Sequence, residues 1–194
     1  MKIKALLLAV TLVLMSVFAA GCARQEETPG PQSQAPQASA NPPDTSPDVL
    51  TSASIVDNAA DFEKAIGTSG TWIICLVKDV TTDKELVLDG EYTNGKKDDD
   101  GKDIIQRKIA LYAQDENRKV SARYTLTAPK LTINSPEARI QSGTFKGDIY
   151  VNVKNFQLVD ATVEGNVYFT TDEAMSTFKK DDSSKITGKS ELKK

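Results

Sequence analysis

The chain has no histidine, only two cysteines and a single tryptophan. Histidine is the commonest general base and metal ligand near neutral pH, so its absence removes the usual basis of hydrolytic and metal-dependent chemistry. Cys75 is the only cysteine after residue 22, so the rest of the chain cannot form an internal disulfide. It lies in the apolar run TWIICLV, which predicts a buried, unreactive thiol. The sequence contains no catalytic constellation, and we expect no enzymatic activity, no cofactor and no metal.

Basic residues are slightly outnumbered by acidic ones. The chain contains 24 Lys and Arg against 27 Asp and Glu, a formal net charge of −3. Residues 1–21 include Lys2 and Lys4 and no acidic residue, so the remainder has 22 basic and 27 acidic residues, a net charge of −5. This balance argues against nucleic acid as a partner and against electrostatic attraction to an anionic membrane surface.

Residues 1–21 have the parts of a secretory signal peptide. Two lysines precede an apolar run from Ala5 to Ala20, which is shorter than the roughly 20 residues that a bilayer span needs. The run leads into AAGC, which resembles the lipobox of bacterial lipoproteins, with Ala19 in place of the leucine that the family favours. The resemblance implies that Cys22 is lipidated and becomes the first mature residue. The alternative is an ordinary signal peptide followed by an incidental cysteine.

The lipobox resemblance also implies a location. It predicts an extracytoplasmic protein whose acylated Cys22 inserts into the lipid bilayer of the cell membrane, where two or more acyl chains hold a protein stably. Ala23 stands where related lipoproteins retained at the inner membrane of two-membrane bacteria carry aspartate. In such an organism the outer membrane is therefore an alternative location.

Residues 22–53 differ in composition from the chain that follows them. They are rich in Pro, Gln, Ser and Ala and contain almost no large apolar side chains. Such a segment cannot bury enough surface to offset the entropy of ordering, so we predict a disordered tether with a reach of roughly 30 Å. The sequence therefore divides into a signal peptide at 1–21, the lipidated cysteine and tether at 22–53, and one folded domain at 54–194.

The folded domain begins with a helical pattern and continues with strands. In VDNAADFEKAIG the apolar residues fall at helical spacing between an N-cap at Asp57 or Asn58 and a stop at Gly67. The following segments are rich in Val, Ile, Thr and Tyr, which predicts strands. TDEAMSTFKK, which starts at Thr171, predicts a second short helix before a last strand in KITGKSEL. Its apolar side consists of Ala174, Met175 and Phe178. Helices at both ends of the strand region favour a monomer.

One twelve-residue stretch occurs twice. IQSGTFKGDIYV (140–151) returns eighteen residues later as LVDATVEGNVYF (158–169). A period of this size, carried by strand formers, predicts an all-β solenoid in which residue i lies about 4.8 Å from residue i+18 in a parallel ladder. Lys146 would then lie against Glu164. The expected strand centres, spaced by about 23, 22, 18, 18 and 19 residues, are Leu86, Ile109, Leu131, Ile149, Val167 and Ile186.

Two parts of the domain are similar to known families. The helix and first strand, DFEKAIGTSGTWIICLV, are similar to the N-terminal part of pectate-lyase-like proteins. The segments TFKGDIYV and TVEGNVYF resemble the coils of bactofilins, which are polymer-forming bacterial proteins. These resemblances imply a single-stranded right-handed parallel β-helix with a short N-terminal capping helix and a short C-terminal helix. The sequence departs from both families, because its N-terminal segment predicts export, unlike bactofilins, and because it lacks the calcium ligands and catalytic Arg or Lys of the lyases.

Tyr150, Tyr168 and Thr132 form the candidate ligand face. The period-two pattern directs Ile149 and Val151 inward, so these three side chains point outward on one face. Stacked tyrosines bind sugar rings or pack against protein. The alternative is lateral packing under an insertion loop or a cap.

Two polar patterns carry a binding hypothesis and a simpler alternative. Asn134, Asn152 and Thr170 follow successive strands and form either a ligand-binding row or an internal hydrogen-bonded ladder. The insertion EYTNGKKDDDGKDIIQ carries an acidic cluster that suggests a weak calcium loop, but it lacks the alternating spacing of calcium-binding loops. A solvated loop is the alternative for this cluster, which consists of Asp98, Asp99, Asp100 and Asp103.

The sequence therefore predicts a non-enzymatic, lipid-anchored protein of the cell envelope that serves as a binding or scaffolding module. Its expected partners, besides the bilayer, are peptidoglycan, another glycan or an envelope protein. A small polysaccharide lyase or hydrolase of pectate-lyase-like fold, using acids near Asp98, Asp148 or Asp160, is one alternative. A self-assembling, bactofilin-like envelope fibre is the other.

Overall fold

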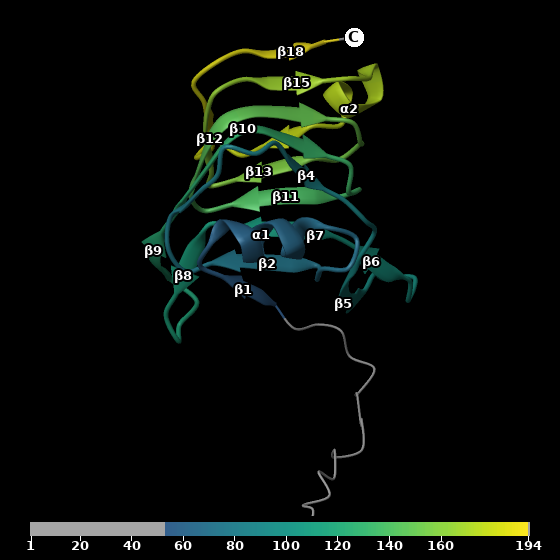
Figure 1. Ribbon diagram of the computed structural model, residues 1–194. Coiled ribbons are helices and arrows are strands. Elements are labelled where there is room, and N and C mark those ends of the chain that lie inside the picture. The colour runs from purple at the N-terminus through teal and green to yellow at the C-terminus, as the bar shows by residue number, and fades with distance from the viewer. Residues whose placement is uncertain (1–52, 194) are drawn as a thin grey trace, which may run out of the picture. The chain divides into compact units, whose positions relative to one another are not determined.

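The structure is a computed structural model that describes residues 53–193 (Figure 1). The signal peptide, Cys22 and nearly all of the tether lie outside these residues, so the inferences about them stay predictions. Strands are the main secondary structure, and the helices of this part of the chain are α1 (Ala59–Ile66) and α2 (Asp172–Ser176). Neither of these two helices is long and apolar enough to cross a bilayer.

Six strands form a first sheet in which every pair is parallel. In spatial order they are β1 (Ser54–Val56), β2 (Ile73–Leu76), β7 (Arg107–Ala110), β11 (Ala138–Gln141), β13 (Gln157–Val159) and β16 (Lys179–Lys180). Between β1 and β2 the chain forms helix α1, and between the later members of this sheet it passes through strands of the second sheet.

The second sheet has eight strands, also paired in parallel. They are β3 (Val80–Thr81), β4 (Leu86–Leu88), β10 (Thr125–Ile133), β12 (Thr144–Val151), β14 (Thr162–Glu164), β15 (Val167–Phe169), β17 (Lys185–Ile186) and β18 (Ser190–Leu192). In Figure 1 the strands of the two sheets run in opposite directions, with β1 at the lower end and β18 at the upper end. The predicted all-β class is confirmed, and the two large sheets are parallel.

The eighteen-residue repeat is also the pairing register. Phe145 pairs with Val163, and Tyr150 pairs with Tyr168, each eighteen residues further along the chain. As predicted, Lys146 lies against Glu164, with 3.1 Å between Nζ and Oε2. The pairing of like with like is therefore confirmed between β12 and the strands β14 and β15.

Backbone conformation repeats with the same offset. Glu137 and Asn155 have φ of 52° and 59°, and Ser142 and Asp160 have φ of 58° and 52°. This left-handed region is uncommon for residues other than glycine, and Asn and Asp are enriched in it. Both pairs also bond to each other through their side chains, Asn155 to Glu137 and Ser142 to Asp160. Each bend is thus held by the equivalent bend of the next layer.

The predicted spacing of the earlier strands is wrong. Leu86 pairs directly with Leu131, 45 residues away, whereas Ile109 belongs to the other sheet and pairs with Ile140. The extra length is taken up by two antiparallel hairpins, β5–β6 (Thr93–Lys97 and Asp103–Ile105) and β8–β9 (Tyr112–Gln114 and Val120–Arg123). One is the predicted insertion, folded as a hairpin, and the other was missed because its strands have the same composition as the strands of the sheets.

The interior between the two sheets is one continuous apolar cluster. Alternation along each strand sends every second side chain inward. Fully burying a side chain such as Leu or Ile contributes about 1.5–3 kcal/mol, so a core of this length is the main source of stability. Its strand members with 1% exposure or less include Ile74, Ile109, Ile140, Leu158, Leu131, Ile149, Val167, Phe145 and Val163.

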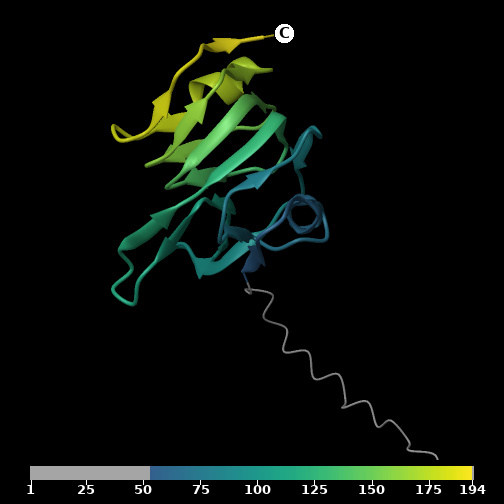
Figure 2. The ribbon, with the colours of Figure 1, turned by 60° about the vertical axis from the view of Figure 1, so that its left-hand side comes forward.

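Helix α1 covers one edge at the N-terminal end. Asn58 caps it by accepting the Asp61 N–H, and Gly67 ends it, as predicted. Phe62 is fully buried, and the Asp89 N–H bonds the Ile66 carbonyl, so the helix lies against the first edge of the second sheet (Figure 2). The matching edge of the first sheet is strand β1.

A buried arginine ties the end of α1 to the sheet. Arg107 Nη2 donates to the carbonyls of Ala65 at 2.6 Å and Gly67 at 3.1 Å, and Nη1 donates to Asp89 O at 3.1 Å. Its guanidinium lies 3.8 Å from the ring centroid of Tyr92. The carbonyls at a helix C-terminus carry partial negative charge, which compensates the cation for its lost hydration.

The C-terminal end forms one more layer. Helix α2 is shorter than predicted, and of the side chains expected on its apolar side Ala174 is buried whereas Met175 is 43% exposed. Phe178 follows the helix and contacts the rings of Phe156 and Phe169 at 5.7 Å and 5.1 Å between centroids. The edge strands of this layer carry several lysines, which discourage pairing with a further strand.

Substitution of a glycine at the stacked bends tests the register. Gly147 has φ of +136°, and a β-carbon there would overlap the carbonyl oxygen of Ala128 in the layer below. We expect Gly147→Ala to lower the free energy of unfolding by more than about 1 kcal/mol, measured by chemical denaturation. Gly67→Ala is the matched control, because its φ of −72° suits alanine and the nearest non-neighbouring atom would be 3.5 Å away. Equal effects of the two substitutions would contradict the close stacking.

Acid should loosen the C-terminal layer through Asp181. Hydrogen bonds from Ser184, Ser183 and the Asp160 amide hold the pKa of this carboxyl at about 2, below its ordinary value of 3.8. Because the folded-state pKa is the lower one, the stabilisation is complete above about pH 4 and is lost as the pH falls toward 2. We expect the melting temperature of Asp181→Asn to fall less steeply than that of the wild type between about pH 4 and pH 2. Asp182→Asn, at the exposed neighbouring position, should leave the decline unchanged.

Candidate functional site

Tyr150 and Tyr168 lie side by side on the outer face of the second sheet. The register aligns Thr132 with Tyr150 and Tyr150 with Tyr168, one strand apart each time. The two rings are 5.0 Å apart between centroids and inclined by 48°. Both rings are half-buried, while Ile149 and Val151 beside them are fully buried. The structure thus brings the three residues of the candidate ligand face together in one row.

Two lysines contact the tyrosine pair. Lys193 Nζ donates to the Tyr150 hydroxyl at 3.0 Å and lies 4.2 Å from the centroid of the Tyr168 ring. Lys130 Nζ lies 5.1 Å from the centroid of the Tyr150 ring and pairs with Glu85 at 3.0 Å. The hydrogen bond to Tyr150 raises the pKa of Lys193, which therefore stays protonated at neutral pH. The pair is an aromatic surface bordered by cations, partly covered by the C-terminal segment.

The row Asn134, Asn152 and Thr170 is a hydrogen-bonded ladder. Asn152 Nδ2 donates to Asn134 Oδ1 at 2.7 Å, and Thr170 Oγ1 bonds Asn152 Oδ1 at 3.0 Å. These bonds favour the internal hydrogen-bonded ladder over the ligand-binding row, the two alternatives that the sequence left open. A parallel ladder was missed: Asn166 donates to Asp148 Oδ1 through both its backbone and its side chain, and accepts the Lys189 N–H.

The acidic cluster forms the turn of hairpin β5–β6. Asp98 Oδ1 accepts the N–H groups of Asp100 and Lys102, at 3.0 Å and 2.8 Å. Asp103 pairs with Lys97 at 2.8 Å, and Asp99 and Asp100 are exposed. Within residues 53–193, no group of three or more acidic, Cys or His side chains is arranged to hold a metal ion. The carboxylate of Asp98 shapes the turn, as Asp115 does in hairpin β8–β9.

The tyrosines and the acidic turn do not share a groove. Asp98 and Asp103 line an open cavity of about 540 Å³ together with Glu91, Glu137 and Lys154. Its lining residues come from hairpin β5–β6 and from the bends beside Glu137 and Lys154, and include none of the three residues of the candidate face. The face is therefore separate from the acidic cluster.

Cys75 is only half-buried, which corrects the prediction of a buried thiol. Its neighbours Ile74 and Leu76 point into the core, so Cys75 points out of the first sheet. Burial raises the pKa of the Cys75 thiol, and nearby Lys108 opposes this. The group is therefore mainly a neutral thiol at neutral pH, with low nucleophilicity.

Sequence reasoning missed a basic cluster, which we define as Lys96, Lys108 and Arg139. Lys108 and Arg139 are direct neighbours on β7 and β11, and Lys96 belongs to β5. They are 43 residues apart at most in the sequence, and only the pairing of β7 with β11 and the folding of hairpin β5–β6 bring them together.

Comparison of the chain with protein-family models, curated proteins and solved structures finds no match.

Proposed function

We propose that the chain is an exported lipoprotein whose folded part is a small right-handed parallel β-helix that serves as a non-enzymatic binding or scaffolding module of the cell envelope. The alternation of the chain between two parallel sheets and the eighteen-residue pairing offset support the β-helix. The right hand follows from the strong preference of connections between parallel strands.

The tyrosine pair is the observation that carries the binding role. Two half-buried rings, fixed in register on neighbouring strands, offer a rigid apolar surface with hydroxyl groups and the ammonium of Lys193 at its border. Sugar rings pack their C–H faces on such aromatic surfaces and bond to polar groups around them. A site built on strands keeps its geometry better than one built on loops. Peptidoglycan or another envelope glycan is the partner that this chemistry fits best.

Retention on cell-wall material tests this role. We expect the full-length chain to co-sediment with purified cell-wall fractions, and Tyr150→Ala or Tyr168→Ala to weaken retention at least about tenfold, because each removes half of the aromatic surface. Val87→Ala is the matched control: Val87 is 43% exposed and pairs with Thr132 in the same row, but contacts neither ring in the register. Equal retention of all variants, or release of soluble sugars from the fraction, would contradict the proposal.

Lipid attachment is tested through Cys22. We expect the wild-type chain to partition with the membrane fraction and to carry acyl groups by mass spectrometry of the N-terminal peptide. Cys22→Ala should move the protein to the soluble extracytoplasmic fraction, since a net charge of −5 for residues 22–194 gives no attraction to an anionic surface. Cys75→Ala is the control and should not change partitioning. Absence of acyl groups from the N-terminal peptide of the wild-type chain would exclude the lipid anchor.

A further inference from the structure

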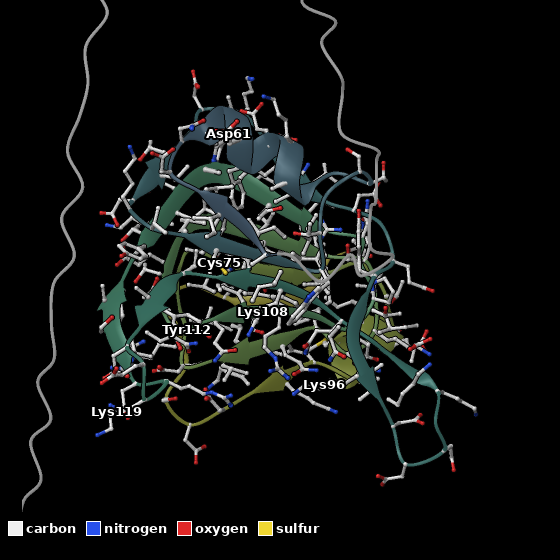
Figure 3. The ribbon with its side chains drawn as sticks, turned by 90° about the horizontal axis from the view of Figure 1, so that it is seen from below. Asp61, Cys75, Lys96, Lys108, Tyr112 and Lys119 are labelled. Atoms are coloured by element: carbon white, nitrogen blue, oxygen red, sulfur yellow. The ribbon has the colours of Figure 1, made fainter. Side chains whose placement is uncertain are left out.

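Three cations converge on the outer face of the first sheet. Lys108 on β7 and Arg139 on β11 are direct partners in the parallel register, and Lys96 reaches the same region from hairpin β5–β6. Figure 3 shows Lys108 near Cys75 and Tyr112, with Lys96 beside it and Lys119 marking the end of hairpin β8–β9. The basic cluster therefore lies on the sheet between two hairpins.

None of the acidic side chains that the structure describes forms a salt bridge with this cluster. Arg139 donates from Nε and Nη2 to Gln157 Oε1, at 3.1 Å and 2.7 Å. Gln157 thus orients the guanidinium without cancelling its charge. In the part of the chain from 53 to 193, none of the salt bridges includes Lys96, Lys108 or Arg139.

Two lysines of the second sheet have carboxylate partners. Lys130 pairs with Glu85 at 3.0 Å and Lys146 pairs with Glu164 at 3.1 Å, each across neighbouring strands. The same stacked geometry could have placed a carboxylate beside Lys108, but it places Arg139 there. Like charges directly opposite each other on neighbouring strands are destabilising.

The surroundings of Lys108 add to this cost. Burial lowers the pKa of Lys108, and the charges of Arg139 and Lys96 lower it further. Trp72 borders the site, with 5.8 Å between Lys108 Nζ and its ring centroid. The buried Nε1 of Trp72 has no hydrogen-bond partner among the described residues. A local arrangement that costs stability in this way is expected where a ligand later compensates for it.

We propose that the basic cluster is a binding site for a phosphate group. A phosphate brings up to two negative charges and several acceptor oxygens, which suits three cations better than a single carboxylate does. Arg139 keeps its Nη1 donors for the anion, while Lys108 and Lys96 supply point charges from either side. The site lies on a different sheet from the tyrosine face and does not depend on the glycan-binding role.

Trp72 is the only tryptophan in the chain, so its fluorescence reports directly on this site. We expect titration of the full-length chain with inorganic phosphate to give a saturable change in emission, with a dissociation constant of about 1 mM or tighter. Lys108→Met should weaken binding at least about tenfold and leave the melting temperature equal or higher, because it removes a half-buried charge beside Arg139. Lys96→Met, at an exposed hairpin position, should weaken binding without any effect on the core.

Lys146→Met is the matched control, because it removes a lysine that already has a carboxylate partner. A linear change that chloride reproduces at equal ionic strength would overturn the proposal. Equal weakening of phosphate binding by Lys146→Met and Lys108→Met would also overturn it.

Two further probes distinguish the possible sources of the phosphate group. Saturable binding of glycerol 3-phosphate would support a soluble phosphoester, and retention on phosphatidylglycerol vesicles that Lys108→Met abolishes would support a lipid headgroup.

Discussion

The parallel register between successive layers is the constraint on which the rest of the structure depends. Apolar residues lie directly above apolar residues, and the backbone hydrogen bonds of one strand fix the position of the next. An interior apolar column, the left-handed bends at Glu137 and Asn155, and the asparagine ladder all follow from this single offset. A shift by one residue would turn every core side chain outward, which makes the register strongly specified.

The same constraint turns surface side chains into rows. A residue type that recurs in successive layers forms a column of like side chains, such as the tyrosines on the second sheet. Where charges recur, the chain either alternates their sign, as Lys146 and Glu164 do, or leaves them unbalanced, as Lys108 and Arg139 are. Both surfaces that we propose as binding sites arise from this repetition on a rigid support.

The two ends of the stack are finished in different ways. At the N-terminal end, α1 takes the place of a strand next to β4. The buried Arg107 donates hydrogen bonds to carbonyl groups at the C-terminal end of this helix. At the C-terminal end, a layer of short lysine-bearing strands and the ring of Phe178 close the core. Charged edges and covering helices both reduce pairing with further strands.

The sequence by itself determined those structural features that depend on neighbouring residues or on the visible repeat. It contained the caps of α1, the eighteen-residue register from 140 to 169, and the outward row of Tyr150 and Tyr168, because each depends on short spacings or on a visible repeat. Only the tertiary structure decided that Leu86 pairs with Leu131 across two hairpins, that Lys108 pairs with Arg139, and that Lys96 lies close enough to Lys108 to affect its pKa. Insertions hide the repeat where they lengthen a layer, and contacts between distant segments leave no periodic trace in the chain.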